Sequence, residues 1–137
     1  MSMKSPVEIV DLMYNNDAYS QWLGIERIKD GLGTSHIKMQ IRKEMCNGFD
    51  IAHGGISYAF ADSALAFASN SHGIKSVSIE TSISHVAPLH EGDWIEAIAT
   101  PKNKTRKIGI YEVEVRKLDG TVVALFKGTV YHTSKEW

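Results

Sequence analysis

The sequence predicts an α+β fold in which a curled, mostly antiparallel sheet wraps around one long buried helix. The stretch 55–70 is rich in alanine and carries apolar residues on every side, which indicates a helix that is buried all round. Five or six other segments alternate apolar and polar residues with the period of strands. Such a helix is fully buried only if a sheet curls around it or a partner chain covers its other face.

The composition indicates one soluble domain, residues 1–137, with its own hydrophobic core. The fractions of hydrophobic and charged residues, 43% and 23%, are ordinary for a globular protein. The net charge of −1 offers no basic field for nucleic-acid binding. The single cysteine, Cys46, excludes an internal disulfide and favours a reducing compartment. Because no signal peptide or membrane-length apolar segment is visible, we expect a cytoplasmic protein without membrane contacts.

Two short helices are predicted before the sheet, over residues 5–23. Ser5-Pro6-Val7-Glu8 has the form of a capping box with proline at the first helical position. A second helical piece is predicted over 17–23. The core of the domain is then expected over 24–132.

The predicted strands cover 25–28, 34–41, 76–86, 94–100, 108–117 and 121–131. Residues that favour turns separate several of them, namely Gly31 and Gly33, Pro88 and Gly92, and Asp119-Gly120. A loop is predicted over 44–52, and Gly73 is predicted to be the C-cap of the long helix. One buried helix with these strands is the arrangement of a hotdog fold.

The long helix contains an acidic residue, Asp62, which is the only formal charge between Ile51 and Ile74. An ionised carboxylate inside a buried helix carries a large desolvation penalty. We therefore interpret Asp62 as a functional group. The structural alternative is a carboxylate that is solvated by a groove or paired with a buried lysine.

The start of this helix, His53-Gly54-Gly55, predicts an anion site. Unpaired backbone N–H groups and the positive end of the helix dipole meet there. Together with a carboxylate, such a site supplies two parts of an acyl-transfer centre. The structural alternatives are a histidine that only makes a backbone hydrogen bond and glycines that only permit tight packing.

Three stretches carry a resemblance to a known family. They are Asn47-Gly48-Phe49-Asp50-Ile51-Ala52-His53-Gly54-Gly55, then Phe60-Ala61-Asp62-Ser63-Ala64, and later Ser78-Ile79-Glu80 with the turn Pro88-Leu89-His90-Glu91-Gly92-Asp93. On these residues the chain resembles the small hotdog-fold acyl-CoA thioesterases of the phenylacetate-pathway type, the PaaI-like family. The resemblance covers residues 20–132.

The resemblance implies roles for five residues. Asp62 matches the catalytic carboxylate, and Gly54 matches the helix-start glycine eight positions before it. Asn47 and His53 match residues that complete the site, and Ser78 matches the residue that helps to hold the attacking water. Coenzyme A is then part of the substrate, and no metal or redox cofactor is expected. Asp62 as general base and Asp62 as nucleophile remain two open routes, and aromatic, short, medium and long acyl groups all remain open.

Four basic residues, Lys102, Lys104, Arg106 and Lys107, are predicted to form a turn between two strands. A solvated loop is the ordinary role of such a run. Because coenzyme A carries phosphates, Lys104, Arg106 and Lys107 are also candidates for binding its nucleotide end. Gly55, at the helix start, is a further candidate for substrate binding.

Two other hydrolase classes are excluded by missing motifs. The six histidines lack metal-ligand spacing with carboxylates, and no Gly-x-Ser-x-Gly elbow is present, so neither a zinc hydrolase nor a serine hydrolase is indicated. Cys46 has no partner pattern for a nucleophilic thiol, and we interpret it as a bystander.

The spacing of Gly54 and Asp62 predicts a dimer. Eight residues of α-helix span about 12 Å, whereas attack on a carbonyl needs reacting groups within about 3–3.5 Å. If both residues act on one thioester, they come from different chains, and a two-fold dimer with facing antiparallel helices has two equal sites. The resemblance further implies a dimer of dimers. The alternative is that one of the two residues is not catalytic.

These observations predict hydrolysis of an acyl-CoA thioester to a carboxylic acid and free coenzyme A. One alternative is a hotdog hydratase or dehydratase, which also uses a carboxylate and a histidine near a helix start. The other alternative is a non-catalytic acyl-CoA-binding module, in which a buried acidic side chain such as Asp62 would have no function.

Overall fold

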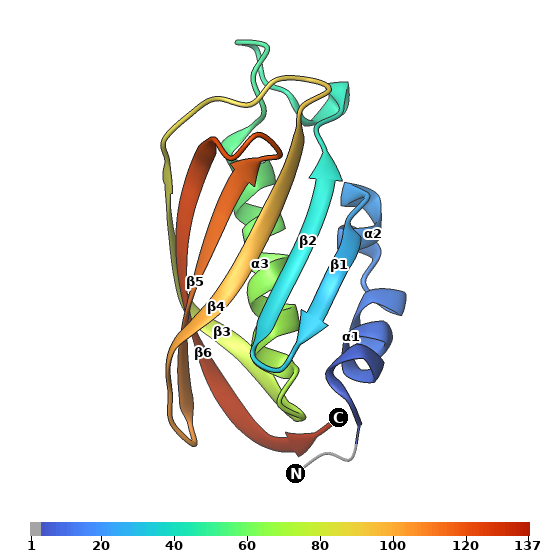
Figure 1. Ribbon diagram of the computed structural model, residues 1–137, viewed down its shortest axis with the longest axis vertical. Coiled ribbons are helices and arrows are strands. Elements are labelled where there is room, and N and C mark those ends of the chain that lie inside the picture. Colours follow the sequence, from blue (N-terminus) through green and yellow to red (C-terminus); the bar gives the residue numbers. More distant parts are fainter. Residues whose placement is uncertain (1–3) are drawn as a thin grey trace.

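Figure 1 shows the computed structural model, which describes residues 4–137, as a six-stranded antiparallel sheet curled around one long helix. In chain order the elements are α1 (Pro6–Asn15), α2 (Ala18–Leu23), β1 (Glu26–Gly31), β2 (Thr34–Gln40), the 3-10 helix η1 (Lys43–Met45), α3 (Gly54–Asn70), β3 (Ile74–His85), β4 (Trp94–Lys104), β5 (Ile108–Lys117) and β6 (Val122–Glu136). The strand order is β1-β2-β4-β5-β6-β3. The predicted α+β class and hotdog arrangement are confirmed.

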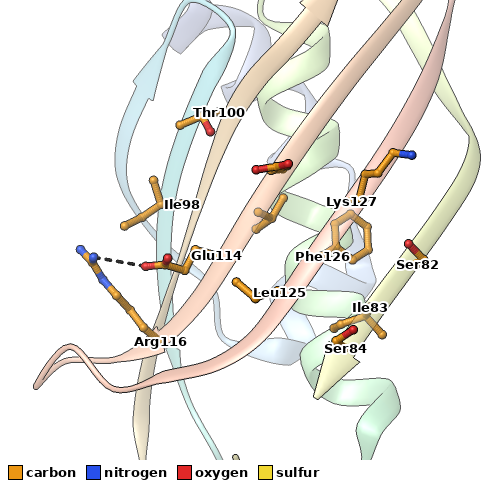
Figure 2. Close-up of a pocket in the computed structure, with 12 residues that line it drawn as sticks. Ser82, Ile83, Ser84, Ile98, Thr100, Glu114, Arg116, Leu125, Phe126 and Lys127 are labelled. Atoms are coloured by element: carbon orange, nitrogen blue, oxygen red, sulfur yellow. Dashed lines mark hydrogen bonds and ion pairs between the residues drawn. The ribbon is translucent and has the colours of Figure 1, made fainter. Parts of the chain in front are cut away.

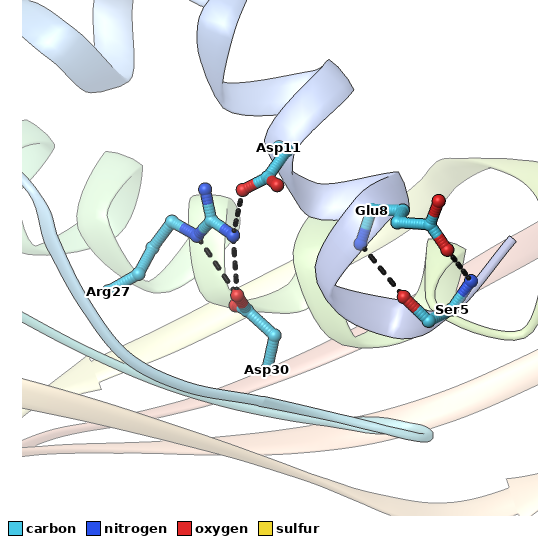
Figure 3. Close-up of polar contacts among 5 residues, drawn as sticks. All are labelled: Ser5, Glu8, Asp11, Arg27 and Asp30. Atoms are coloured by element: carbon cyan, nitrogen blue, oxygen red, sulfur yellow. Dashed lines mark hydrogen bonds and ion pairs between the residues drawn. The ribbon is translucent and has the colours of Figure 1, made fainter.

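The two N-terminal helices begin where the sequence predicts them, with Ser5 and Asp17 as N-caps. Figure 3 shows the capping box of the first helix. In the capping box of α1, Ser5 Oγ accepts from Glu8 N at 3.2 Å, and Glu8 Oε1 accepts from Ser5 N at 2.9 Å. Arg27 on β1 donates to Asp11 on α1 at 2.8 Å and to Asp30 on the same strand at 2.6 Å. The ion pair between Arg27 and Asp11 thereby links α1 to β1, the strand at one edge of the sheet.

The interior of the curled sheet packs against α3. Buried side chains of β2, β4, β5 and β6 surround the helix, among them Ile37, Met39, Ile95, Val113, Val115, Phe126 and Val130. Helix α3 lies close to the sheet at Gly128 of β6, where a Cβ atom would lie 2.4 Å from Leu65 Cδ2. A side chain at that position would push the helix away from the sheet, so glycine allows this contact.

Helix α3 departs from the prediction of burial on all sides. Gly55 is exposed, and Tyr58, Ala59, Asp62 and Ala66 are only half-buried. Their spacing of three and four residues places them on one face of the helix, which we call the open stripe. The sheet therefore covers most of α3 but leaves this stripe for another surface. Within residues 4–137, no helix is both long and apolar enough to cross a membrane.

Several predicted boundaries are wrong. Strand β1 runs to Gly31 instead of 28, and β6 runs to Glu136 instead of 131. Gly73 is not the C-cap of α3, because the helix ends at Asn70 with Ser71 as C-cap, and Gly73 lies in the following turn with a φ of 99°. The basic turn is also shorter than predicted, because the ladder between β4 and β5 continues to Lys104. The turn itself comprises 105–107 and closes through Thr105 N donating to Ile108 O at 2.7 Å.

Candidate active site

The loop before α3 holds Asn47 in a tight turn. Asn47 N donates to Ile51 O at 2.8 Å, and Asn47 Oδ1 accepts from Phe49 N at 2.9 Å. Asp50 has a φ of 61°, a left-handed conformation that aspartate tolerates better than most residues. Because Oδ1 is engaged inside the turn, the Nδ2 amide is the part of the Asn47 side chain that can donate to a ligand.

The first turn of α3 leaves one of its leading backbone donors unpaired. His53 is the N-cap, with Nδ1 accepting from Gly55 N at 3.4 Å, and its carbonyl accepts from Ile56 N at 2.9 Å. Over the described range 4–137, no acceptor is found for the Gly54 N–H. This N–H lies at the positive end of the helix dipole, so it can bind a carbonyl oxygen that gains negative charge. The Gly55 N–H, in contrast, is already used by His53.

Asp62 lies on the open stripe of α3, half-buried and without a hydrogen-bond or ion-pair partner among residues 4–137. Burial raises the pKa of its carboxyl group above the ordinary value, and the negative charge of Asp17 raises it further. No lysine pairs with it, so the structure does not support that structural alternative. An unpaired carboxylate of raised pKa is suited to accept a proton or to attack a carbonyl.

Asp17 is joined to α3 by two hydroxyl groups. It caps α2 by accepting from Ser20 N at 2.9 Å, and its Oδ2 accepts from Ser20 Oγ at 2.6 Å. Ser20 Oγ in turn lies 2.8 Å from Ser63 Oγ, and Ser63 is the neighbour of Asp62. Asp17, the N-cap of α2, thereby places a second negative charge near the carboxylate of Asp62.

We expect Asp17→Asn to move the acidic limb of the pH–activity profile to lower pH. Removing the Asp17 charge removes one cause of the raised pKa of Asp62, so Asp62 stays ionised, and active, at lower pH. Asparagine keeps the N-cap of α2. The measurement is kcat/KM against pH, with Asp11→Asn as the control, because Asp11 pairs with Arg27 instead. An unmoved limb would show that Asp17 does not act on Asp62.

Four of the five predicted catalytic residues fall into two pairs within one chain. Asn47 and Gly54 line a hollow of about 350 Å³ between the loop and the end of β3. Asp62 and Ser78 line another hollow of about 260 Å³ between α3 and β3. The structure therefore brings Asp62 to Ser78 and Gly54 to Asn47, but the two pairs lie in different hollows along α3.

The other candidates lie apart from both pairs. His53 and Gly55 line a third hollow of about 290 Å³, together with Tyr19 of α2. Lys104, Arg106 and Lys107 are exposed at the β4–β5 turn, which lies at the opposite end of α3 from Gly54 (Figure 1). In the single chain these basic residues do not reach either pair.

The largest hollow, about 540 Å³, contains none of the predicted site residues. Figure 2 shows it along β3, β4, β5 and β6, with Glu114 and Arg116 paired at 3.5 Å. Val113 of β5 also lines this hollow, although Val113 and the nearby Val115 belong to the buried core. We do not place the chemistry in this hollow, because it lacks both the carboxylate of α3 and the donor at the start of α3.

Two residues that the sequence did not single out join Asn47 and Gly54. His85, the last residue of β3, and Ser57 of α3 line the same hollow. His85 Nδ1 lies 3.3 Å from Ser57 Oγ. The only signal in the sequence is a histidine at the end of a predicted strand, three residues before Pro88.

Comparison with known proteins agrees with this geometry. A family model described as the thioesterase superfamily matches residues 49–124. The chain is 35% identical to a putative esterase of Archaeoglobus fulgidus, over 94% of this chain and 84% of that protein. It is 34% identical to the acyl-coenzyme A thioesterase PaaI of Escherichia coli, over 85% of this chain and 83% of the relative.

Solved structures agree as well. The Escherichia coli PaaI protein from the phenylacetic acid degradation operon superimposes with a TM-score of 0.94 at 30% identity, covering 96% of this chain and 95% of that one. A mutant of the phenylacetic acid degradation protein PaaI from Thermus thermophilus matches with a TM-score of 0.82 at 35% identity, covering 85% of this chain and 100% of that one.

Proposed function

This chain belongs to the thioesterase superfamily, and on that premise we propose that it hydrolyses an acyl-CoA thioester to a carboxylic acid and free coenzyme A. The observation that carries the proposal is a Gly54 N–H at the start of α3 and an Asp62 carboxylate on the same helix, both without a partner among residues 4–137. The first can stabilise an oxyanion, and the second can deliver water or attack the carbonyl.

The two groups act on one thioester if they come from different chains. Their separation along α3 is about 12 Å, and within one chain they line different hollows. Two chains with antiparallel α3 helices facing each other through the open stripe would bring Gly54 of one chain to Asp62 of the partner. Such a two-fold dimer has two identical sites.

The free edge of β3 supports this dimer. β3 is an edge strand of the sheet, so one of its edges has no partner strand among residues 4–137. It exposes Val77 by 55% and Ile79 by 58%, and an exposed edge with apolar side chains readily pairs with another strand. We propose that β3 pairs with β3 of a second copy beside the facing helices, and that such dimers associate further into a tetramer.

The reaction would proceed as follows. The carbonyl oxygen of the thioester accepts a hydrogen bond from Gly54 N–H, which stabilises the negative charge that forms on attack, an effect worth a few kcal/mol (about 3–4). Asp62 of the other chain removes a proton from water, or attacks directly to give an anhydride that water then hydrolyses. Ser78 shares the hollow of Asp62 and would hold the water. The thiolate of coenzyme A leaves.

The remaining candidates would bind and orient the substrate. The Nδ2 amide of Asn47 would donate a hydrogen bond to the thioester, because Oδ1 is already bonded to Phe49 N, and His53 would hold the first turn of α3 through Gly55 N. The exposed side chains of Lys104, Arg106 and Lys107 would bind the phosphates of coenzyme A from the partner chain. We propose no metal or redox cofactor, because Gly54 and Asp62 supply carbonyl polarisation and water activation. A cytoplasmic location fits the free thiol of Cys46.

Thiol release from a panel of acyl-CoA thioesters tests this function. The panel should include phenylacetyl, short, medium and long saturated acyl groups, with released thiol measured against time. We expect steady turnover of at least one saturated substrate. Hydration or dehydration at the β-carbon without thiol release would identify a hydratase. Tight binding without turnover would identify a binding module.

We expect His53→Ala to lower kcat/KM less than Asp62→Asn does. The substitution removes the acceptor of Gly55 N–H, which loosens the first turn of α3 and the placement of the thioester. His53→Asn keeps an N-cap acceptor and should recover most of the activity. The measurement is kcat and KM of the three proteins across pH. A larger loss than at Asp62 that His53→Asn does not recover would make His53 the base, because asparagine cannot accept a proton.

A further inference from the structure

We propose that His85 is a further catalytic residue, whose Nε2–H donates a second hydrogen bond to the carbonyl oxygen bound by Gly54 N–H. The inference rests on the proposed function and adds one donor to its site. It starts from the position of His85 at the end of β3, where the strand passes the first turn of α3.

The distances allow one oxygen to be shared by both donors. A Cβ atom at Gly54 would lie 3.2 Å from His85 Nε2. Because the nitrogen and Cβ of one residue are about 2.5 Å apart, the Gly54 nitrogen and His85 Nε2 are separated by about 5.7 Å at most. A carbonyl oxygen can therefore lie about 2.9 Å from each nitrogen, the ordinary hydrogen-bond length.

The donor role needs the His85 tautomer with its proton on Nε2, and Ser57 is the neighbour of the other ring nitrogen, Nδ1. Ser57 Oγ lies 3.3 Å from His85 Nδ1 and 3.3 Å from Gly54 O. A carbonyl in the first turn of a helix accepts from the N–H four residues later, so Gly54 O has a backbone donor of its own. In the proposed arrangement the Ser57 hydroxyl, which donates to Gly54 O in the structure, turns to donate to His85 Nδ1, so that Nε2 carries the N–H that binds the carbonyl oxygen. Ser57 is thus a positioning residue for His85.

The walls of the hollow favour a strong hydrogen bond. Besides Asn47, Gly54, Ser57 and His85, the lining is apolar and consists of Ile51, Ala52, Val86, Ala87, Pro88, Leu89 and Val123. A hydrogen bond to a charged oxygen is stronger where water is displaced by apolar groups. The same geometry explains glycine at position 54, since any side chain would enter the space between the two donors.

Two substitutions of His85 test the donor role. His85→Phe keeps an aromatic ring but removes the donor, and should lower kcat by about 10²-fold, the usual effect of losing one oxyanion donor. His85→Gln places an amide N–H near the position of Nε2 and should stay within about tenfold of wild type. His90→Phe, at an exposed histidine in the next loop, is the matched control and should leave kcat unchanged. All variants are compared by circular dichroism and size-exclusion chromatography.

A pair of non-hydrolysable ligands separates the donor role from a packing role. An S-alkyl-CoA thioether has no carbonyl oxygen, whereas an S-(2-oxoalkyl)-CoA carries one. His85→Phe should bind the thioether as wild type does and bind the oxo compound at least about tenfold more weakly. Equal weakening for both ligands, a kcat within about threefold of wild type, or a failure of His85→Gln to restore kcat would overturn the proposal. If wild type releases no thiol from any acyl-CoA, the proposed function itself fails.

Discussion

Asp62→Asn is expected to abolish most thioester hydrolysis while the fold and the dimer persist. Asparagine has the shape of aspartate, but it can neither accept a proton from water nor attack as a carboxylate. We therefore expect kcat to fall by about 10²–10⁴-fold, the range that a general base contributes. The fold should be preserved, because the Asp62 carboxylate has no hydrogen bond or ion pair among residues 4–137 that the substitution could break.

The measurement is thiol release from the preferred acyl-CoA, with circular dichroism and size-exclusion chromatography as checks of fold and assembly. Asp119→Asn is a suitable control. Asp119 lies in the β5–β6 turn, where its side chain accepts from Thr121 N at 2.9 Å, and asparagine can make the same bond. Activity of Asp62→Asn within about threefold of wild type would remove Asp62 from the mechanism.

The fold was predictable because local patterns and global architecture agree. The capping box at Ser5, the Asp119-Gly120 turn and the alternation in the strands each determine a local element. The apolar side chains of α3 must then be buried by other elements, and the curled sheet buries most of them. The open stripe, however, depends on the curvature of the sheet around Ala59 and Ala66, which the pattern of one helix does not reveal.

The ends of elements were less predictable than their existence. Gly73 has the residue type of a C-cap, but the side chain of Asn70 bonds to the backbone of Ser76 on β3, and the helix ends there. Similarly, the basic residues Lys102 and Lys104 favour a loop, but the ladder with β5 extends the strand through them. In both cases a contact with a neighbouring strand decides the boundary.

The candidate site was predictable only in part, for a similar reason. Gly54 and Asp62 lie in one apolar helix, so their context could be interpreted directly, whereas Asn47 became a candidate only through the family resemblance. His85 lies 31 residues after Gly54 along the chain, and only the return of β3 past the start of α3 brings the two together. The influence of Asp17 on Asp62 likewise depends on the packing of α2 against α3.

The central claim is that each active site takes Gly54 from one chain and Asp62 from the other, and mixed dimers are expected to show it. One variant carries Asp62→Asn, and the other carries Gly54→Val, whose side chain would collide with His85 and block the carbonyl. Each homodimer should be inactive. In a mixed dimer, one site carries both substitutions and the other carries neither, so one of the two sites is restored.

The direct measurement is thiol release by mixed dimers purified through two different affinity tags. We predict about half of wild-type activity per dimer for the mixed dimer of the two single variants, or about a quarter for an unpurified equal mixture. The control is a mixed dimer of wild type with a chain carrying both substitutions, in which every site contains one lesion and activity should be lost. The opposite pattern, an inactive first dimer and a half-active control, would place each site within one chain and contradict the account.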